Sequence, residues 1–403
     1  MLQSAGWAAH RVLFTLGDRF LTGLRPGMSR ETVRGGLADW SRRCRALLDD
    51  WKPDVIILFG SSRPIHEVAR KMAALRGIRV LSLEEGYIRP GFVTVEDGGN
   101  NADSPLCRIP PVVGWPMPDL TGTDFAGARS CAWHAFLHYG LMALAGEGSA
   151  FPLSHRSFRA GSEAAGWIRA GLHRLRHGGV ADRAAETETG GRPAFLVALQ
   201  VPGDLSLLSG ANGWTQQGFI RQVISSFAVK APAGTDLVFR IHPLDRGRST
   251  LPGPIRAAAE AAGIGDRVVV TQSGSLGRAL DTARGFLTLT SSSALVALMR
   301  GVPVLTAGRA IHSHPGLAWS VADIDRFWTE ARAADADLVS GFLARVRREA
   351  LVPGDFHAPP GRREAKTRIA EICEENVRLK RAVGRRSDLL TANSLARLQA
   401  VNP

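Results

Sequence analysis

The chain has 403 residues, 45% hydrophobic and 22% charged, a composition typical of a soluble globular protein with two domains. No stretch approaches the ~18 uninterrupted apolar residues that a membrane span requires. The net charge of +13 and the pI near 10.7 predict attraction to polyanions, but they do not separate nucleic acid, anionic lipid and phosphorylated substrates.

The amino-terminal part shows the order strand, helix, strand. Apolar residues at helical spacing run from Leu37 to Trp51, and the β-branched run at residues 55–59, bounded by Gly60, predicts a buried parallel strand. We expect a helix at about residues 65–75 and a further strand at residues 80–83. These elements indicate an α/β lobe.

The domain arrangement follows from a polar, glycine-containing stretch that resembles a linker. We expect an amino-terminal α/β lobe with a helical extension at 1–177, the linker at 178–193, a second α/β lobe at 194–350 and a basic helical tail at 351–403. A solvated helical face explains the tail better than a lipid-facing patch does.

Five strands alternating with helices predict the second α/β lobe. The strands are expected at residues 194–201, 237–241, 268–271, 286–290 and 302–306. We therefore expect two doubly wound, Rossmann-type lobes. Because their polar loops lie at the carboxyl ends of strands, ligands are expected to bind in the crevice between the lobes. This is the GT-B arrangement of nucleotide-sugar glycosyltransferases.

Two adjacent carboxylates, Glu84 and Glu85, stand where a predicted strand runs into a loop. Because successive side chains of an extended segment point to opposite sides, one carboxylate can face the crevice while the other binds backbone or Arg89. We favour Glu85, nearer the loop, as the reactive group. An ion pair with Arg89 that fixes the loop remains the structural alternative.

Two further segments of the first lobe offer polar contacts. Residues 94–101 supply Glu96, Asp97 and Asn101 as candidates for substrate contacts, although a turn explains this segment nearly as well. The loop after Gly60 carries Arg63 and His66 toward the acceptor side, and a capped helix start explains that loop equally well.

The second lobe supplies candidates for binding a phosphate. Pro243 holds His242 at a strand end, with Arg240 and Arg246 adding positive charge nearby. Residues 290–293 place hydroxyls and backbone amides at a helix start, where phosphate oxygens bind. A serine cap without a ligand is the alternative for those residues.

The sequence shows no HExxH motif and no tight His/Asp cluster, so we expect no metal, and it shows no GxxxxGK[ST] or GxGxxG motif of a kinase or a dehydrogenase. No other cofactor is expected. Unpaired cysteine spacing predicts reduced thiols at Cys44, Cys107, Cys131 and Cys373. Since no secretory signal pattern is present, we expect a cytoplasmic location.

The order and spacing of these segments over about residues 12–350 resemble the capsule polysaccharide synthesis family, whose KpsS- and KpsC-type members are β-Kdo transferases that use CMP-Kdo. The resemblance is carried by the following residues: Leu58-Phe59-Gly60 with Arg63-Pro64 and His66, Glu84 to Pro90, Thr94, Glu96, Gly98-Gly99 and Asn101, Leu199-Gln200-Val201, His242 to Gly247, Ser291-Ser292, Gly301, Pro303-Val304, Gly308 to Ile311 and Pro315 to Leu317.

The resemblance implies transfer of Kdo from CMP-β-Kdo to a phosphatidylglycerol-type lipid, with retention of configuration, at the inner face of the cytoplasmic membrane. By position, Glu85 would be the crevice carboxylate, with Glu84 beside it, and protonated His242 would contact the CMP phosphate. Ser291 and Ser292 would hold that phosphate. Substrate contacts are expected from Arg63, Arg89, Glu96, Asn101 and Arg309. Other capsule assembly and export proteins are further expected partners.

This chain departs from the family pattern at several positions. Ser61 stands where the family has Asp, Arg240-Ile241 replaces a basic-His pair, and Thr290 replaces Asn; no strand with a glycine-rich loop is predicted before Arg11. A non-catalytic assembly or export partner that keeps the fold is therefore the alternative function. Nucleic-acid binding rests on charge alone, and we expect none.

Overall fold

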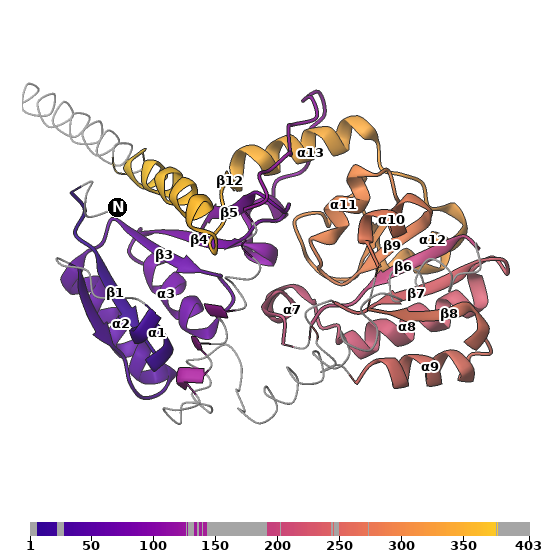
Figure 1. Cartoon of the computed structure of the whole chain (residues 1–403), viewed down its shortest axis with the longest axis horizontal. Coiled ribbons are helices and arrows are strands. Elements are labelled where there is room, and N and C mark those ends of the chain that lie inside the picture. Colours follow the sequence, from indigo (N-terminus) through magenta and orange to yellow (C-terminus); the bar gives the residue numbers. More distant parts are fainter. Residues whose placement is uncertain are drawn as a thin grey trace, which may run out of the picture.

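The computed structural model describes residues 6–21, 28–125, 192–242 and 250–375, except positions 202 and 273, with a few isolated residues from 127 to 142, at 245 and at 377. Over these residues the chain forms two α/β lobes that lie side by side (Figure 1). Most of the predicted linker and of the helical extension lies outside the described residues.

The first lobe contains a four-stranded sheet in the order β12-β5-β4-β3. Its strands are β3 (Val55–Phe59), β4 (Arg79–Glu85), β5 (Phe92–Asp97) and β12 (Leu351–Pro353). The predicted β3 and β4 are confirmed, and they are parallel because α3 (Pro64–Ala74) crosses between them. This sheet also contains antiparallel pairs, because β5 follows β4 in a hairpin and pairs antiparallel both with it and with β12.

The outer face of this sheet is covered by two helices. The apolar side of α2 (Leu37–Trp51) packs on α3 through Trp40, whose indole Nε1 donates to the carbonyl of Ile65 at 2.8 Å. Beside them lies a two-stranded parallel sheet of β1 (His10–Leu13) and β2 (Ser29–Thr32), with α1 (Leu16–Leu21) between them. The sequence analysis did not predict β1, because four residues are too short to show a period.

The second lobe contains a six-stranded sheet in which every pair is parallel. Its strands are β6 (Ala194–Ala198), β7 (Asp236–Arg240), β8 (Val268–Thr271), β9 (Ala283–Thr288), β10 (Val304–Thr306) and β11 (Trp319–Ser320). The five predicted strands are confirmed to within three residues at each end, and β11 was not predicted. The order β8-β7-β6-β9-β10-β11 is that of the Rossmann fold, in which the direction of winding reverses between β6 and β9.

Helices on both faces of this sheet bury an aromatic core. They are α7 (Leu205–Gly210), α8 (Gln216–Lys230), α9 (Pro252–Ala261), α10 (Leu276–Asp281), α11 (Ser293–Met299) and α12 (Ile324–Glu330). Phe195, Phe227 and Trp328 pack edge to face, with the rings of Phe195 and Trp328 centred 5.0 Å apart. Such a dense core is a rigid support for the loops at the strand ends.

The chain returns to the first lobe near its carboxyl end. After α13 (Ala336–Glu349), β12 pairs with β5, and the helix at residues 359–375 packs Ala365, Ile369 and Cys373 against that sheet (Figure 1). The basic residues of the tail beyond Val377 lie outside the described residues. With this return, the two lobes have the expected GT-B-like architecture.

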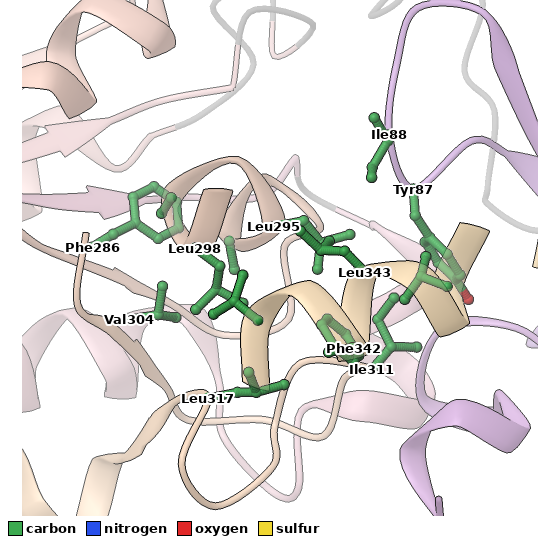
Figure 2. Close-up of a cluster of buried hydrophobic side chains, with 14 of the residues drawn as sticks. Tyr87, Ile88, Phe286, Leu295, Leu298, Val304, Ile311, Leu317, Phe342 and Leu343 are labelled. Carbon is green, nitrogen blue, oxygen red and sulfur yellow. The ribbon is translucent and has the colours of Figure 1, made fainter. Parts of the chain in front are cut away.

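An apolar cluster joins the lobes. Tyr87 and Ile88, from the β4–β5 hairpin, are buried in the same cluster as Leu295 of α11 and Phe342 and Leu343 of α13 (Figure 2). The hairpin that carries the two glutamates is therefore held against the second lobe by apolar burial.

Candidate active site

Loops from both lobes meet at the carboxyl ends of the strands. The hydroxyl of Ser62, in the loop after β3, lies 3.0 Å from that of Ser209 in α7, and Nε2 of His314 lies 2.8 Å from the carbonyl oxygen of Leu106. Gly210 stands at this contact, since a Cβ there would lie 2.8 Å from the carbonyl oxygen of Arg309 and 3.2 Å from Cβ of Ala102. A side chain at Gly210 would collide with the backbone of Arg309 in its own lobe and press on Ala102 of the other lobe.

On the side of the second lobe, the meeting point is the switch between β6 and β9. Gln200 follows β6, and its Oε1 accepts hydrogen bonds from the backbone N (3.2 Å) and Oγ1 (3.0 Å) of Thr290, which follows β9. Its Nε2 donates to Ser206 Oγ at 2.7 Å and to Asp204 Oδ2 at 3.1 Å. In open α/β sheets, ligands bind in this crevice at the carboxyl ends of the strands.

His242 and Arg240 stand beside this switch. Burial lowers the pKa of His242, an effect that the carboxylates of Asp204 and Asp245 oppose and that the nearby guanidinium of Arg89 reinforces. The neutral imidazole is thus favoured at pH 7, contrary to the expectation of a protonated ring. Arg240 donates to the carbonyl of Gly274 at 2.7 Å, and burial lowers its pKa. Arg246 lies outside the described residues.

Ser291 and Ser292 precede α11 as expected. The hydroxyls of Ser291 and Ser293 are 2.7 Å apart, and the backbone N of Ser291 donates to Thr288 Oγ1 at 3.3 Å. Ser292 occupies the cap position without a side-chain capping bond, and it is partly exposed. Its hydroxyl is therefore not committed to the helix start.

The two glutamates of the first lobe have different surroundings, as the strand alternation predicts. Glu85 Oε1 lies 2.7 Å from Nε2 of His357, a residue of the segment that returns after β12. Burial raises the pKa of Glu84. The negative charge of Asp204 in the second lobe also raises this pKa, and the positive charge of Arg63 lowers it. Glu84 thus lies within electrostatic reach of Asp204 in the opposite lobe, and the partner of Glu85 is His357 rather than Arg89.

Arg63 and His66 lie on the same side as Glu84. The Nε of Arg63 is buried without a hydrogen-bond partner. His66 bonds through Nδ1 to the carbonyl of Gly60 at 2.8 Å, and burial together with the charge of Arg63 lowers its pKa to about 3. An uncompensated buried donor next to Glu84 is suited to an anionic group of a ligand.

Glu96 and Asn101 belong to a buried network. Glu96 accepts a 2.6 Å bond from the hydroxyl of Tyr87 and a short bond from Ser104, and burial raises its pKa to about 7. The backbone N of Asn101, which has a φ of 55°, donates to the same Tyr87 oxygen at 2.6 Å. A role of either residue in substrate contact stays a prediction, and these bonds give Glu96 a structural role.

The remaining candidates are at the rim. Arg89 is exposed in the β4–β5 hairpin and lies near His242. Arg309 follows β10, and its Nη2 lies 3.9 Å from Asp103 of the first lobe. Asp97, a further candidate for substrate contact, forms an ion pair with Arg79 on the surface instead.

The roles of three residues were not predicted from the sequence. Asp204 caps α7 by accepting from the backbone N of Ser206 at 2.9 Å, and the sequence Pro-Gly-Asp after a predicted strand is a usable cap signal. Gln200 was noted only as part of a motif. His357 carried no local signal, because its partner Glu85 is 272 positions away.

The comparisons with known proteins identify the family. The family model described as "Capsule polysaccharide biosynthesis protein" matches residues 54–113 and 147–357, more than half of the chain. The chain belongs to the capsule polysaccharide biosynthesis family. Within the ranges that the structure describes, this family member has no cluster of three or more potential metal ligands, and no helix is both long and apolar enough to cross a membrane.

Curated relatives cover most of this family member. It is 30% identical over 351 residues to the capsule polysaccharide export protein KpsS of Escherichia coli, covering 85% of this chain and 88% of that protein. It is 28% identical over 315 residues to the capsule polysaccharide modification protein LipB of Neisseria meningitidis serogroup B, covering 75% and 74%. A solved structure of the beta Kdo 2,7 transferase KpsC of Thermosulfurimonas dismutans is 14% identical, with a TM-score of 0.39, covering 83% of this chain and 89% of that one.

Proposed function

We propose that this chain is a retaining glycosyltransferase that moves Kdo from CMP-β-Kdo to a phosphatidylglycerol-type lipid in the synthesis of a capsule linker. The observation that carries the proposal is the meeting of two half-sites: the Gln200–Thr290 switch, with Asp204 and His242, stands within electrostatic reach of Glu84 and Arg89 from the other lobe. A crevice of this kind suits a nucleotide-activated sugar.

The second lobe would bind the donor. The hydroxyls of Ser291 and Ser292 and the neutral imidazole of His242 donate hydrogen bonds to the phosphate of the CMP group. As the phosphate leaves with negative charge, that charge favours protonation of His242 and thereby stabilises the departing CMP. Arg240 contributes its positive charge from the position fixed by Gly274.

The first lobe would supply the carboxylate that acts at the sugar. Glu84 fits this role, because burial raises its pKa and makes its anion a stronger base or nucleophile, and because it lies near Asp204 of the donor lobe. Retention then follows from a covalent sugar adduct on that carboxylate or from front-face substitution without one. Glu85, which the sequence alone favoured, would hold the return segment through His357.

The acceptor would enter from the same side as Arg63. Its buried, unpartnered Nε and the exposed Arg89 and Arg309 suit the phosphate of an anionic lipid headgroup. With a lipid acceptor and a nucleotide-sugar donor, we propose that the protein works as a peripheral protein at the inner face of the cytoplasmic membrane.

The test is direct. The full chain is incubated with CMP-Kdo generated in situ and with phosphatidylglycerol, and the lipid is analysed by mass spectrometry. The proposal predicts a product heavier by one Kdo residue, together with release of CMP. Binding of CMP without any product would favour the alternative, a non-catalytic assembly or export partner, which the name of the Escherichia coli relative suggests.

A further inference from the structure

An exposed apolar loop follows the segment that closes the candidate site. Residues 109–118 have the sequence Ile-Pro-Pro-Val-Val-Gly-Trp-Pro-Met-Pro and contain no charged side chain between Arg108 and Asp119. The exposed fractions of Ile109, Val113 and Met117 are 40%, 63% and 51%. Exposed apolar side chains are common singly, but a run of them on one loop marks an interaction surface.

Contacts with α13 fix the position of the loop at residues 109–118 without burying its apolar side chains. Arg345 of α13 donates to the carbonyl of Pro110 at 2.8 Å, and the guanidinium of Arg348 lies 4.1 Å from the centre of the Trp115 ring. Gly341 leaves room for the backbone of Val112, which a Cβ at that position would overlap. The contact with α13 thus fixes the base of the loop, while Val113 and Met117 stay in solvent.

We propose that the loop at residues 109–118 inserts into the surface of an anionic lipid bilayer. Three observations favour lipid over a protein partner. The exposed Val113 and Met117 have no polar group, the partly buried Trp115 stacks on Arg348 as aromatic and basic residues do at a membrane interface, and four of the ten residues are prolines, which have no N–H to desolvate in an apolar phase.

The charges at the base of the loop complement an anionic surface. Arg108 is exposed, and the side chain of Arg348 is 60% exposed next to the partly buried Arg345. Both arginines share one carboxylate, Glu349, so together with Arg108 they leave a net positive charge at the base of the loop. Basic residues that flank an inserted apolar segment attract anionic headgroups. The loop follows the short helix Pro105–Cys107, which comes directly after Asn101–Asp103, and Asp103 lies 3.9 Å from Arg309 of the second lobe.

The inference rests on the proposed function in one respect, that the acceptor is a lipid. Membrane binding is measured without the CMP-sugar donor, so its result does not depend on catalysis. The full chain and a Val113→Asp/Met117→Asp variant are sedimented with phosphatidylglycerol–phosphatidylcholine vesicles at ~1 M salt, where the Debye length is about 3 Å and charge attraction is screened. We expect the wild type to bind and the variant to bind at least ~10-fold less, because a buried carboxylate is unfavourable in the bilayer.

The matched control is Leu75→Asp/Val229→Asp, which makes the same charge change at side chains that are 85% and 74% exposed elsewhere. Vesicle binding by this control should stay within twofold of the wild type. Thermal unfolding curves first establish that both variants are folded. Equal vesicle binding by the two folded variants would then overturn the inference. Loop-dependent binding without Kdo transfer would instead leave the inference standing and reject the proposed function.

Discussion

Thr290 donates two hydrogen bonds to Oε1 of Gln200, from its backbone N at 3.2 Å and from Oγ1 at 3.0 Å. The two residues follow β9 and β6, the adjacent strands between which the sheet reverses its winding. The pair therefore fixes the floor of the crevice in which we propose that the donor binds, and Asp204 and Ser206 extend the same network toward the opposite lobe.

Replacing Gln200 with Ala tests that network. The change removes the acceptor of Thr290 in a buried setting, so we expect the free energy of unfolding to fall by about 1–3 kcal/mol and KM for the CMP-sugar to rise. Chemical denaturation and initial rates measure both. Gln217→Ala, at an exposed position of α8, is the control and should change neither quantity. A loss of equal size in the control would remove the special role of Gln200.

The choice between the two glutamates is tested by one pair of variants. Glu84→Gln should lower the rate of Kdo transfer by at least ~10²-fold, because the carboxylate that we propose acts at the sugar is lost. Glu85→Gln should keep most of the transfer rate. The reverse result, an active Glu84→Gln and an inactive Glu85→Gln, would reinstate the preference that the sequence alone gave.

The Glu85–His357 pair should contribute to stability instead. The two side chains are 31% and 25% exposed and lie 2.7 Å apart, which is consistent with a hydrogen bond that anchors the return segment. In a double-mutant cycle of Glu85→Gln and His357→Ala, we expect a coupling free energy of about 1 kcal/mol or more. Additive losses would mean that the pair does not act as a unit.

Glu96 predicts a pH dependence of stability. Burial raises its pKa from 4.5 to about 7, so between these values the folded state binds more protons than the unfolded state. Its protonated carboxyl therefore stabilises the fold fully below about pH 4.5, and this contribution, roughly 3 kcal/mol, is lost as the pH rises through 7.

Unfolding of Glu96→Gln, measured by denaturant at several pH values, checks this expectation. The amide does not titrate, so the variant should gain stability relative to the wild type as the pH rises from 5 to 8. Glu67→Gln, at an exposed ion pair on α3, is the control and should show no such trend. A difference between wild type and Glu96→Gln that is constant with pH would contradict the assignment.

Local patterns predicted the parts of the fold that depend on short-range physics. The β-branched run Val55–Phe59 and the helical spacing from Leu37 to Trp51 each indicate their element, and the strand alternation separated the surroundings of Glu84 and Glu85. The strand β12 was missed, because its three residues show no period and its partner β5 is more than 250 positions earlier.

For the candidate site, too, the sequence indicated local features but not the contacts made by tertiary structure. Motif order indicated both proposed half-sites, but the different surroundings of the two glutamates depend on Asp204 and His357, two residues that only tertiary contacts bring near them. The burial of Glu96 under Tyr87 and Ser104 was likewise invisible in the sequence, where a carboxylate in a glycine-rich segment looks available for substrate.

A crystal structure of the protein with CMP would test the central claim most directly. We predict that the phosphate lies at the carboxyl ends of β6 and β9, within hydrogen-bond reach of His242 and Ser292, with Glu84 as the carboxylate that faces it from the first lobe. A CMP bound away from this switch, or a crevice in which packed protein separates Glu84 from the phosphate, would contradict the account.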